Sequence, residues 1–187
     1  MTVVSASTLP DHLDFLVMQP DQERAVVRDL VFAVLAFNKY SSGEPLQISF
    51  PLYTDAKVSA RDVLGPCIRV TGPGEKLYVL TLRYEVAAHL RAGRAMTFVR
   101  DRAVVEANRN ERFTLVSSLR AAPSAKVARP RPLVLAGHSQ LIEAAGRLGV
   151  AVRDEAAFVT RGESAVAIEG VVDLLGFSQR KTLPVLK

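Results

Sequence analysis

The sequence predicts an α/β (α+β) fold, arranged as one compact domain with an N-terminal helix. Three observations indicate this class: apolar residues at helical spacing over Gln22–Lys39, several short apolar runs separated by glycine and proline, and a strand, turn and helix in series within Pro132–Val150. The length of 187 residues suits a single domain spanning 1–187. A chain of this length can bury a hydrophobic core without disulfides or metals.

The N-terminal part is predicted to contain an extension followed by a long helix. Residues 1–20 are interpreted as the extension, with a strand-like piece at Asp11–Met18. Asp21 is a typical N-cap residue, so a helix is expected over Gln22–Lys39. Its many apolar positions indicate packing in the core, with an interaction helix for a partner as the alternative.

The middle of the chain is predicted to form short strands and helices, because glycine, proline and asparagine punctuate runs that are apolar or alternate in polarity. The loop Thr71–Gly74 lacks the Gly-Lys-Ser or Gly-Lys-Thr ending of a nucleotide-binding loop, so it is interpreted as a hairpin turn. The expected strands are 46–52, 67–70, 76–82, 95–100, 103–107 and 112–119, with a turn at 108–110, and the expected helices are 59–64 and 85–92.

The C-terminal part begins with a short apolar strand, Leu133–Leu135. A helix capped by Ser139 follows, and Gly149 stands where a helix usually ends. Beyond it, the pattern predicts strands at 150–152 and 158–160, a helix over 163–175 and a basic tail at 178–187.

Positive charge is concentrated in one segment of the chain. The net charge is +5, but Arg91–Arg131 carries +7 and the rest carries −2. Within this segment, residues 121–132 form a basic loop with three prolines, which is expected to be extended. The charge of the segment Arg91–Arg131 indicates either a polyanion-binding surface or a solvated arginine-rich face. The candidate DNA-binding residues are Arg100, Arg102, Lys126, Arg129 and Arg131.

Composition disfavours several classes of protein. The richest apolar run, Ala25–Phe37, is interrupted by Arg28 and Asp29, so nothing approaches the roughly 20 apolar residues of a membrane span. The one cysteine, Cys67, excludes an internal disulfide and fits a reducing cytoplasm. The histidines are too far apart for metal-ligand spacing, and His89 is expected at the surface or half-buried on a helix.

The turn within Pro132–Val150 carries the candidate chemistry. The first amides of a helix have no acceptor within the helix, and together with the helix dipole they attract phosphate and other anions. The candidate phosphate- or nucleotide-binding residues are therefore Gly137, His138, Ser139 and Gln140, with an ordinary strand-to-helix turn as the alternative. The imidazole of His138 is suited to act as a general base toward a phosphate-bound water.

Glu143 is the second candidate catalytic residue. It lies one helical turn after Ser139, where a carboxylate could orient a water or hold Mg²⁺ during phosphoryl transfer. Two other interpretations remain open. In one, the negative charge of Glu143 stabilises the helix by lying near its N-terminus. In the other, Glu143 forms an ion pair with Arg147, four residues further on.

The same segment resembles the strand–loop–helix signature of the ParB/sulfiredoxin superfamily, over 19 of the 187 residues. The chain departs from the signature where superfamily members usually carry arginines, since it has Ser139 and Gln140 there. It also lacks the cysteine that lies beside the turn histidine of sulfiredoxin, so sulfinic-acid reductase activity is not expected. The matching residues are Leu133, Val134, Leu135, Ala136, Gly137, His138, Leu141, Glu143, Ala144, Ala145, Leu148 and Gly149.

The resemblance implies a fold with a mixed sheet flanked by helices. It also implies the function of a nucleotide- and DNA-binding phosphohydrolase, with ATPase or DNase activity, ATP as substrate and Mg²⁺ as metal ion. The chain's length and basic segment also resemble plasmid fertility-inhibition proteins of the Osa type, which act against conjugative DNA transfer. That similarity implies a protein partner in a DNA-transfer apparatus. The alternative is a non-catalytic ParB-like module that binds DNA or a protein.

Overall fold

The computed structural model describes residues 12–53, 64–99, 105–116, 130–166, 168–178 and 183–186. In these residues the chain forms four α-helices and two four-stranded sheets, so the predicted α+β class is confirmed. One mixed sheet was expected, but the strand pairs of both described sheets are antiparallel. A helix with the length and apolar character needed to cross a membrane is not found in the described residues.

Sheet A takes its strands from the N-terminal half of the chain, in the order β2-β3-β1-β4. β1 is an interior strand, so residues 12–17 do not belong to the predicted extension over 1–20. The reason is the alternation along β1, since Leu13, Phe15 and Val17 share one buried face. The strands are β1 (His12–Val17), β2 (Gln47–Ser49), β3 (Cys67–Thr71) and β4 (Ala95–Phe98).

The other face of sheet A contains a buried charged pair. Asp14 and Arg69 lie directly opposite each other on β1 and β3. Arg69 donates from Nε and Nη2 to the two carboxylate oxygens of Asp14, over 2.6 and 2.7 Å, and both side chains are buried. A shift of one residue between the strands would leave both charges buried without a partner, so the pair specifies their register.

Sheet B takes its strands from the C-terminal half, in the order β6-β7-β5-β8. A continuous cluster of buried apolar side chains joins the two sheets. At its centre Phe50, which follows β2, packs edge-on against Phe113 of β5 with 5.4 Å between ring centroids. The strands are β5 (Val105–Val116), β6 (Arg131–Val134), β7 (Ala156–Ser164) and β8 (Leu183–Leu186), and α4 (Ser139–Arg147) follows β6.

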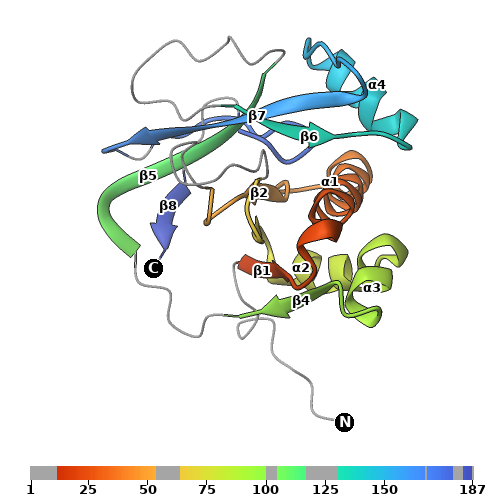
Figure 1. Cartoon of the computed structure of the whole chain (residues 1–187). Helices are drawn as coiled ribbons and strands as arrows, with labels where there is room; N and C mark the ends of the chain where they lie inside the picture. Colours follow the sequence, from red (N-terminus) through yellow and green to blue (C-terminus); the bar gives the residue numbers. More distant parts are fainter. Residues whose placement is uncertain are drawn as a thin grey trace.

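Helix α1 (Glu23–Tyr40) lies at the centre of the helical layer. Figure 1 shows β6 and α4 on one side of it, and α2 (Gly74–Leu82) and α3 (Tyr84–Arg91) on the other. Val31, Ala33 and Val34 are fully buried, which confirms that this helix packs in the core. The predicted N-cap, Asp21, instead lies in a short 3₁₀ helix, Pro20–Gln22, that leads into α1.

Two predictions for the middle of the chain are wrong. Residues 76–82 belong to α2 rather than to a hairpin strand, because Leu77 and Leu80 are buried while the two residues between them are exposed. The expected turn at 108–110 lies inside the continuous strand β5. There Asn110 pairs with β7 on one side and with β8 on the other, which keeps the backbone extended.

The segment after α4 also differs from the prediction. Instead of a helix over 163–175, Glu163 and Ser164 end β7, and Asp173 forms a turn by accepting hydrogen bonds from the amides of Leu175 and Phe177. The predicted strand at 150–152 is not formed, the one at 158–160 lies within β7, and part of the tail forms β8. Most of the predicted helix 59–64 and of the loop 121–132 lies outside the described residues, although residues 131 and 132 belong to β6.

Candidate functional site

The predicted strand, turn and helix within Pro132–Val150 is present. The amide of Leu135 donates to Glu155 O over 2.8 Å, and the amide of His138 closes the turn by donating to Leu135 O over 3.1 Å. Gly137 has a φ of +80° at the tip of this turn, a conformation that side-chain-bearing residues rarely adopt. α4 then begins at Ser139, with His138 as its N-cap residue and without a side-chain capping hydrogen bond.

The first amides of α4 are available to a ligand. Leu141 and Ile142 donate from their amides to His138 O. In the described part of the chain, the amides of Gly137, Ser139 and Gln140 have no acceptor, and these three residues are exposed. The turn therefore has the unpaired donors that an anion-binding corner requires.

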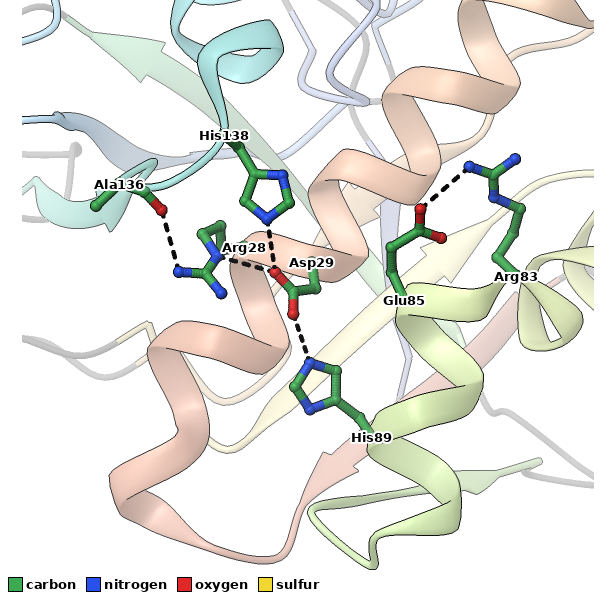
Figure 2. Close-up of polar contacts among 7 residues, drawn as sticks. All are labelled: Arg28, Asp29, Arg83, Glu85, His89, Ala136 and His138. Atoms are coloured by element: carbon green, nitrogen blue, oxygen red, sulfur yellow. Dashed lines mark hydrogen bonds and ion pairs between the residues drawn. The ribbon is translucent and has the colours of Figure 1, made fainter.

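The imidazole of His138, the residue that precedes α4, is directed at Asp29 on α1. Its Nε2 lies 3.0 Å from Oδ1 of Asp29, and its ring packs against Phe32 with 4.7 Å between centroids. A carboxylate can only accept hydrogen bonds, so Nε2 carries the proton in this contact. The lone pair of the neutral ring is then on Nδ1, which has no hydrogen-bond partner among the described residues (Figure 2).

Asp29 is the centre of a group of polar side chains, which we call the Asp29 cluster: Arg28, Asp29, His89 and His138. His89 Nε2 lies 2.8 Å from Oδ2 of Asp29, and Arg28 Nε donates to Oδ1 over 2.9 Å. Arg28 also donates from Nη1 to Ala136 O in the turn, over 3.1 Å. The cluster thus connects three parts of the chain: α1, α3 and the turn before α4 (Figure 2).

The cluster keeps Asp29 ionised. Burial opposes the charge of this carboxylate, but hydrogen bonds from His89 and Arg28, with the positive charge of Arg28, outweigh it and lower the pKa of Asp29 to about 2. The side chain of Asp29 is 17% exposed and that of His138 is 22% exposed. A partly buried carboxylate therefore orients an imidazole that still reaches the surface, which is the arrangement of an oriented general base.

Glu143 is not a member of the Asp29 cluster. Its carboxylate accepts a hydrogen bond from Arg147, and both side chains are largely exposed. This is the i,i+4 ion pair that the spacing predicted as one alternative, and an exposed pair of this kind contributes only a few tenths of a kcal/mol.

Only one of the candidate DNA-binding residues lies in the described part of the chain. Arg131 is the first residue of β6 and is 1% exposed, because it shares the core-facing side of that strand with Leu133. This burial contradicts its assignment to a DNA-binding surface. Arg100, Arg102, Lys126 and Arg129 lie outside the described residues.

Sequence reasoning missed three members of the Asp29 cluster. Arg28 and Asp29 gave a signal, since they interrupt an otherwise apolar run on a helix that is buried. His89 gave none: it is buried rather than at the surface or half-buried, and it is 60 residues from Asp29 in sequence. In the residues that the structure describes, no group of three or more His, Cys, Asp or Glu side chains is placed to hold a metal ion.

Comparison with known proteins adds no relative. No protein-family model matches the chain, and no curated protein matches it.

Proposed function

We propose that this protein binds a phosphate group of a nucleotide or nucleic acid at the N-terminus of α4 and hydrolyses the phosphoester with His138 as general base. The observation that carries the proposal is the 3.0 Å contact between His138 Nε2 and Asp29 Oδ1, beside three exposed amides that have no acceptor in the described residues. An anion held by those amides would lie next to an imidazole whose orientation is already fixed.

The reaction requires one water molecule and no covalent intermediate. The water oxygen attacks phosphorus while Nδ1 of His138 takes its proton, and Asp29 stabilises the imidazolium that forms. The bond between phosphorus and the leaving oxygen breaks, and that oxygen departs with the electron pair. In DNA the leaving oxygen takes a proton from solvent, and the imidazolium of His138 returns its proton to solvent, which restores the base. With ATP as substrate, Mg²⁺ bound to the nucleotide would neutralise charge on the leaving phosphates.

The proposal extends to the superfamily that the turn resembles. A ParB/sulfiredoxin-like protein with ATPase or DNase activity would use the Gly137–Gln140 turn for phosphate, and its action on DNA would fit a role against conjugative transfer. The support is the turn motif and the +7 charge of Arg91–Arg131. Because Ser139 and Gln140 replace the usual arginines, the backbone amides are the phosphate donors that this proposal relies on.

Hydrolysis of Mg-ATP and of linear DNA by purified variants tests the proposal. We expect His138→Ala to lower kcat by about 100-fold, because it removes the general base. Asp29→Asn should lower kcat less, since the ring remains but loses its charged partner. Glu75→Gln, an exposed substitution on α2, is the control and should match the wild type. Equal rates in wild type and His138→Ala, or no hydrolysis in either, would contradict the proposal.

The phosphate-binding amides are tested separately by two substitutions at one position. Ser139→Pro removes an amide donor at the first position of α4, where proline is compatible with a helix. Ser139→Ala keeps that amide and removes only the hydroxyl. We expect Ser139→Pro to weaken binding of a labelled ATP at least several-fold more than Ser139→Ala does. The opposite order would assign the contact to the hydroxyl.

A non-catalytic module that binds a protein partner is the second candidate function. It is favoured by four large apolar side chains that are strongly exposed on α2 and α3, namely Tyr78, Val79, Leu82 and Tyr84. Light scattering of the wild type and of a Tyr78→Ser, Leu82→Ser variant gives a first measure of association through this surface. A monomeric wild type that hydrolyses phosphoesters would favour the first function over this one.

A further inference from the structure

His89 has one nitrogen in a position that packing does not explain. The side chain is 6% exposed, and its Nδ1 is buried without a hydrogen-bond partner. His89 lines a cavity of about 10 Å³ whose other lining residues are apolar: Phe15, Val26, Leu30, Val86, Leu90 and Ala95. A water there would have one polar partner, fewer than buried waters require. An aliphatic residue would fill this space at a lower cost, so the reason for a histidine lies elsewhere.

The other nitrogen of His89 supplies that reason. Nε2 lies 2.8 Å from Oδ2 of Asp29, on the side of the ring that faces α1 (Figure 2). Because the carboxylate only accepts, Nε2 is the donor in this contact, and in the neutral ring the lone pair is then on the buried Nδ1. His89 is thereby committed to a single contact, with Asp29.

The contact to Oδ2 determines which oxygen remains for His138. Arg28 is adjacent to Asp29 and donates to Oδ1 through Nε alone. A guanidinium prefers to bind both oxygens of a carboxylate at once. With Oδ2 free, Arg28 could take both oxygens and rotate the carboxylate away from His138. With Oδ2 held by His89, Oδ1 stays directed at His138 Nε2.

We infer that His89 is a positioning residue for His138. It holds Asp29 through the hydrogen bond to Oδ2, and Asp29 in turn keeps the imidazole of His138 oriented. The catalytic part of this inference rests on the proposed function, but the orientation itself does not. His89 touches no reacting atom, and its effect passes from α3 through α1 to the turn before α4.

The orientation is measured by nuclear magnetic resonance on the full chain. In the wild type, we expect the Nε2 proton of His138 to give a downfield resonance that exchanges slowly with water, and His138→Ala identifies it by its loss. His89→Leu removes the donor to Oδ2 and should speed this exchange about 10-fold or more. His89→Gln can place an amide donor near the position of Nε2 and should restore slow exchange. His89→Asn, whose amide is one bond shorter, should not.

Hydrolysis of Mg-ATP supplies a second measurement on the same variants. We expect His89→Leu to lower kcat about 10-fold while KM stays within about two-fold, and His89→Gln to recover most of the loss. Ile48→Val is the control for a general loss of stability. It removes one buried methyl group from β2, which is the edge strand of sheet A opposite to β4.

Two results would overturn the inference. One is slow exchange of the His138 proton in His89→Leu, which would mean that Asp29 is held without His89. The other is fast exchange in both His89→Leu and His89→Gln, which would mean that the hydrogen bond to Oδ2 is not the cause. If His89→Leu does not fold, His89→Gln is compared with His89→Asn. Slow exchange in His89→Gln with fast exchange in His89→Asn supports the inference, and equal exchange rates in the two variants contradict it. A wild type without hydrolytic activity would refute the proposed function, while the exchange measurement would still test the positioning.

Discussion

Two partly buried aspartates differ in charge behaviour because their hydrogen-bond partners differ. At Asp29, burial is outweighed by hydrogen bonds from His89 and from the charged guanidinium of Arg28, and the pKa is lowered to about 2. Asp173 is held by backbone amides, whose hydrogen bonds do not offset the burial that raises its pKa to about 6. A backbone amide carries no net charge, so it compensates less for the loss of hydration than a cation does.

The raised pKa of Asp173 predicts a pH-dependent cost to stability. The folded protein binds a proton at this residue between pH 4 and pH 6, where the unfolded chain does not, so the free energy of unfolding should fall as pH rises through this range. Asp173→Asn is neutral and its Oδ1 can still accept from Leu175 and Phe177. We expect this variant to be more stable at pH 8, by on the order of 1 kcal/mol, and unchanged at pH 4.

Urea denaturation of both proteins at the two pH values measures the effect. Comparing the variant with the wild type cancels the titration of other groups. A gain that is equal at pH 4 and pH 8 would show that the charge of Asp173 is not the cause.

At the scale of elements, the turn that follows Asp173 fixes the contact between the C-terminal segment and the core. Gly176 has a φ of +86° and accepts a hydrogen bond from the amide of Ile48 on β2. A Cβ on Gly176 would lie 2.9 Å from Val34 Cγ1 and 3.1 Å from Ile48 Cγ1. Gly43 has a similar φ of +84°, but a Cβ there would meet nothing within 4 Å.

These two glycines form a matched pair for mutagenesis. Gly43→Ala should cost about 1 kcal/mol, which is the cost of the positive φ alone. Gly176→Ala should cost at least about 2 kcal/mol, because the contacts with Val34 and Ile48 are added. Thermal or urea unfolding measures both variants. Equal losses would mean that the core around Gly176 adjusts to the extra methyl group.

The sequence was informative for elements whose signals are local. α1, α3 and α4 follow from apolar spacing, and the turn at Gly137 and the helix end at Gly149 follow from glycine, whose φ values of +80° and +74° bear this out. β5 was mispredicted because distant partners determine it, since it stays extended through pairing with β7 and β8. α2 was mispredicted because its helical signal is short, with only Leu77 and Leu80 buried, three residues apart.

The Asp29 cluster shows the same limit within the candidate site. His138 was found from the turn that contains it, but Asp29 lies 109 residues away in sequence. No local pattern relates two side chains at that separation. Whether they meet depends on how α1 packs against β6, which only the tertiary structure describes.

At the scale of the whole molecule, a few polar contacts accompany the apolar core that joins the two sheets. Tyr53, which follows β2, donates from its hydroxyl to Val159 O of β7 over 3.1 Å, in a buried environment. Arg28 of α1 donates to Ala136 O beyond β6. If the sheets unfold as one cooperative unit, weakening one such contact should reduce the stability of both.

Tyr53→Phe tests this coupling. We expect a loss of about 1 kcal/mol, since the buried carbonyl of Val159 loses a donor. Amide hydrogen exchange should show equal losses for β3 in sheet A and β7 in sheet B. Tyr84→Phe, at a residue that is 78% exposed, is the control and should change neither. A loss confined to β7 would show that the sheets open independently.

The arrangement of the strands along the chain has a consequence during synthesis. Every strand of sheet A precedes every strand of sheet B, so sheet A can close its hydrogen bonds while the second half is still on the ribosome. In that interval Phe50 lacks Phe113 and Phe177, the rings that cover it in the finished protein. The nascent chain therefore exposes an apolar aromatic surface until sheet B has been synthesised. Chaperones are expected to bind mainly during that interval.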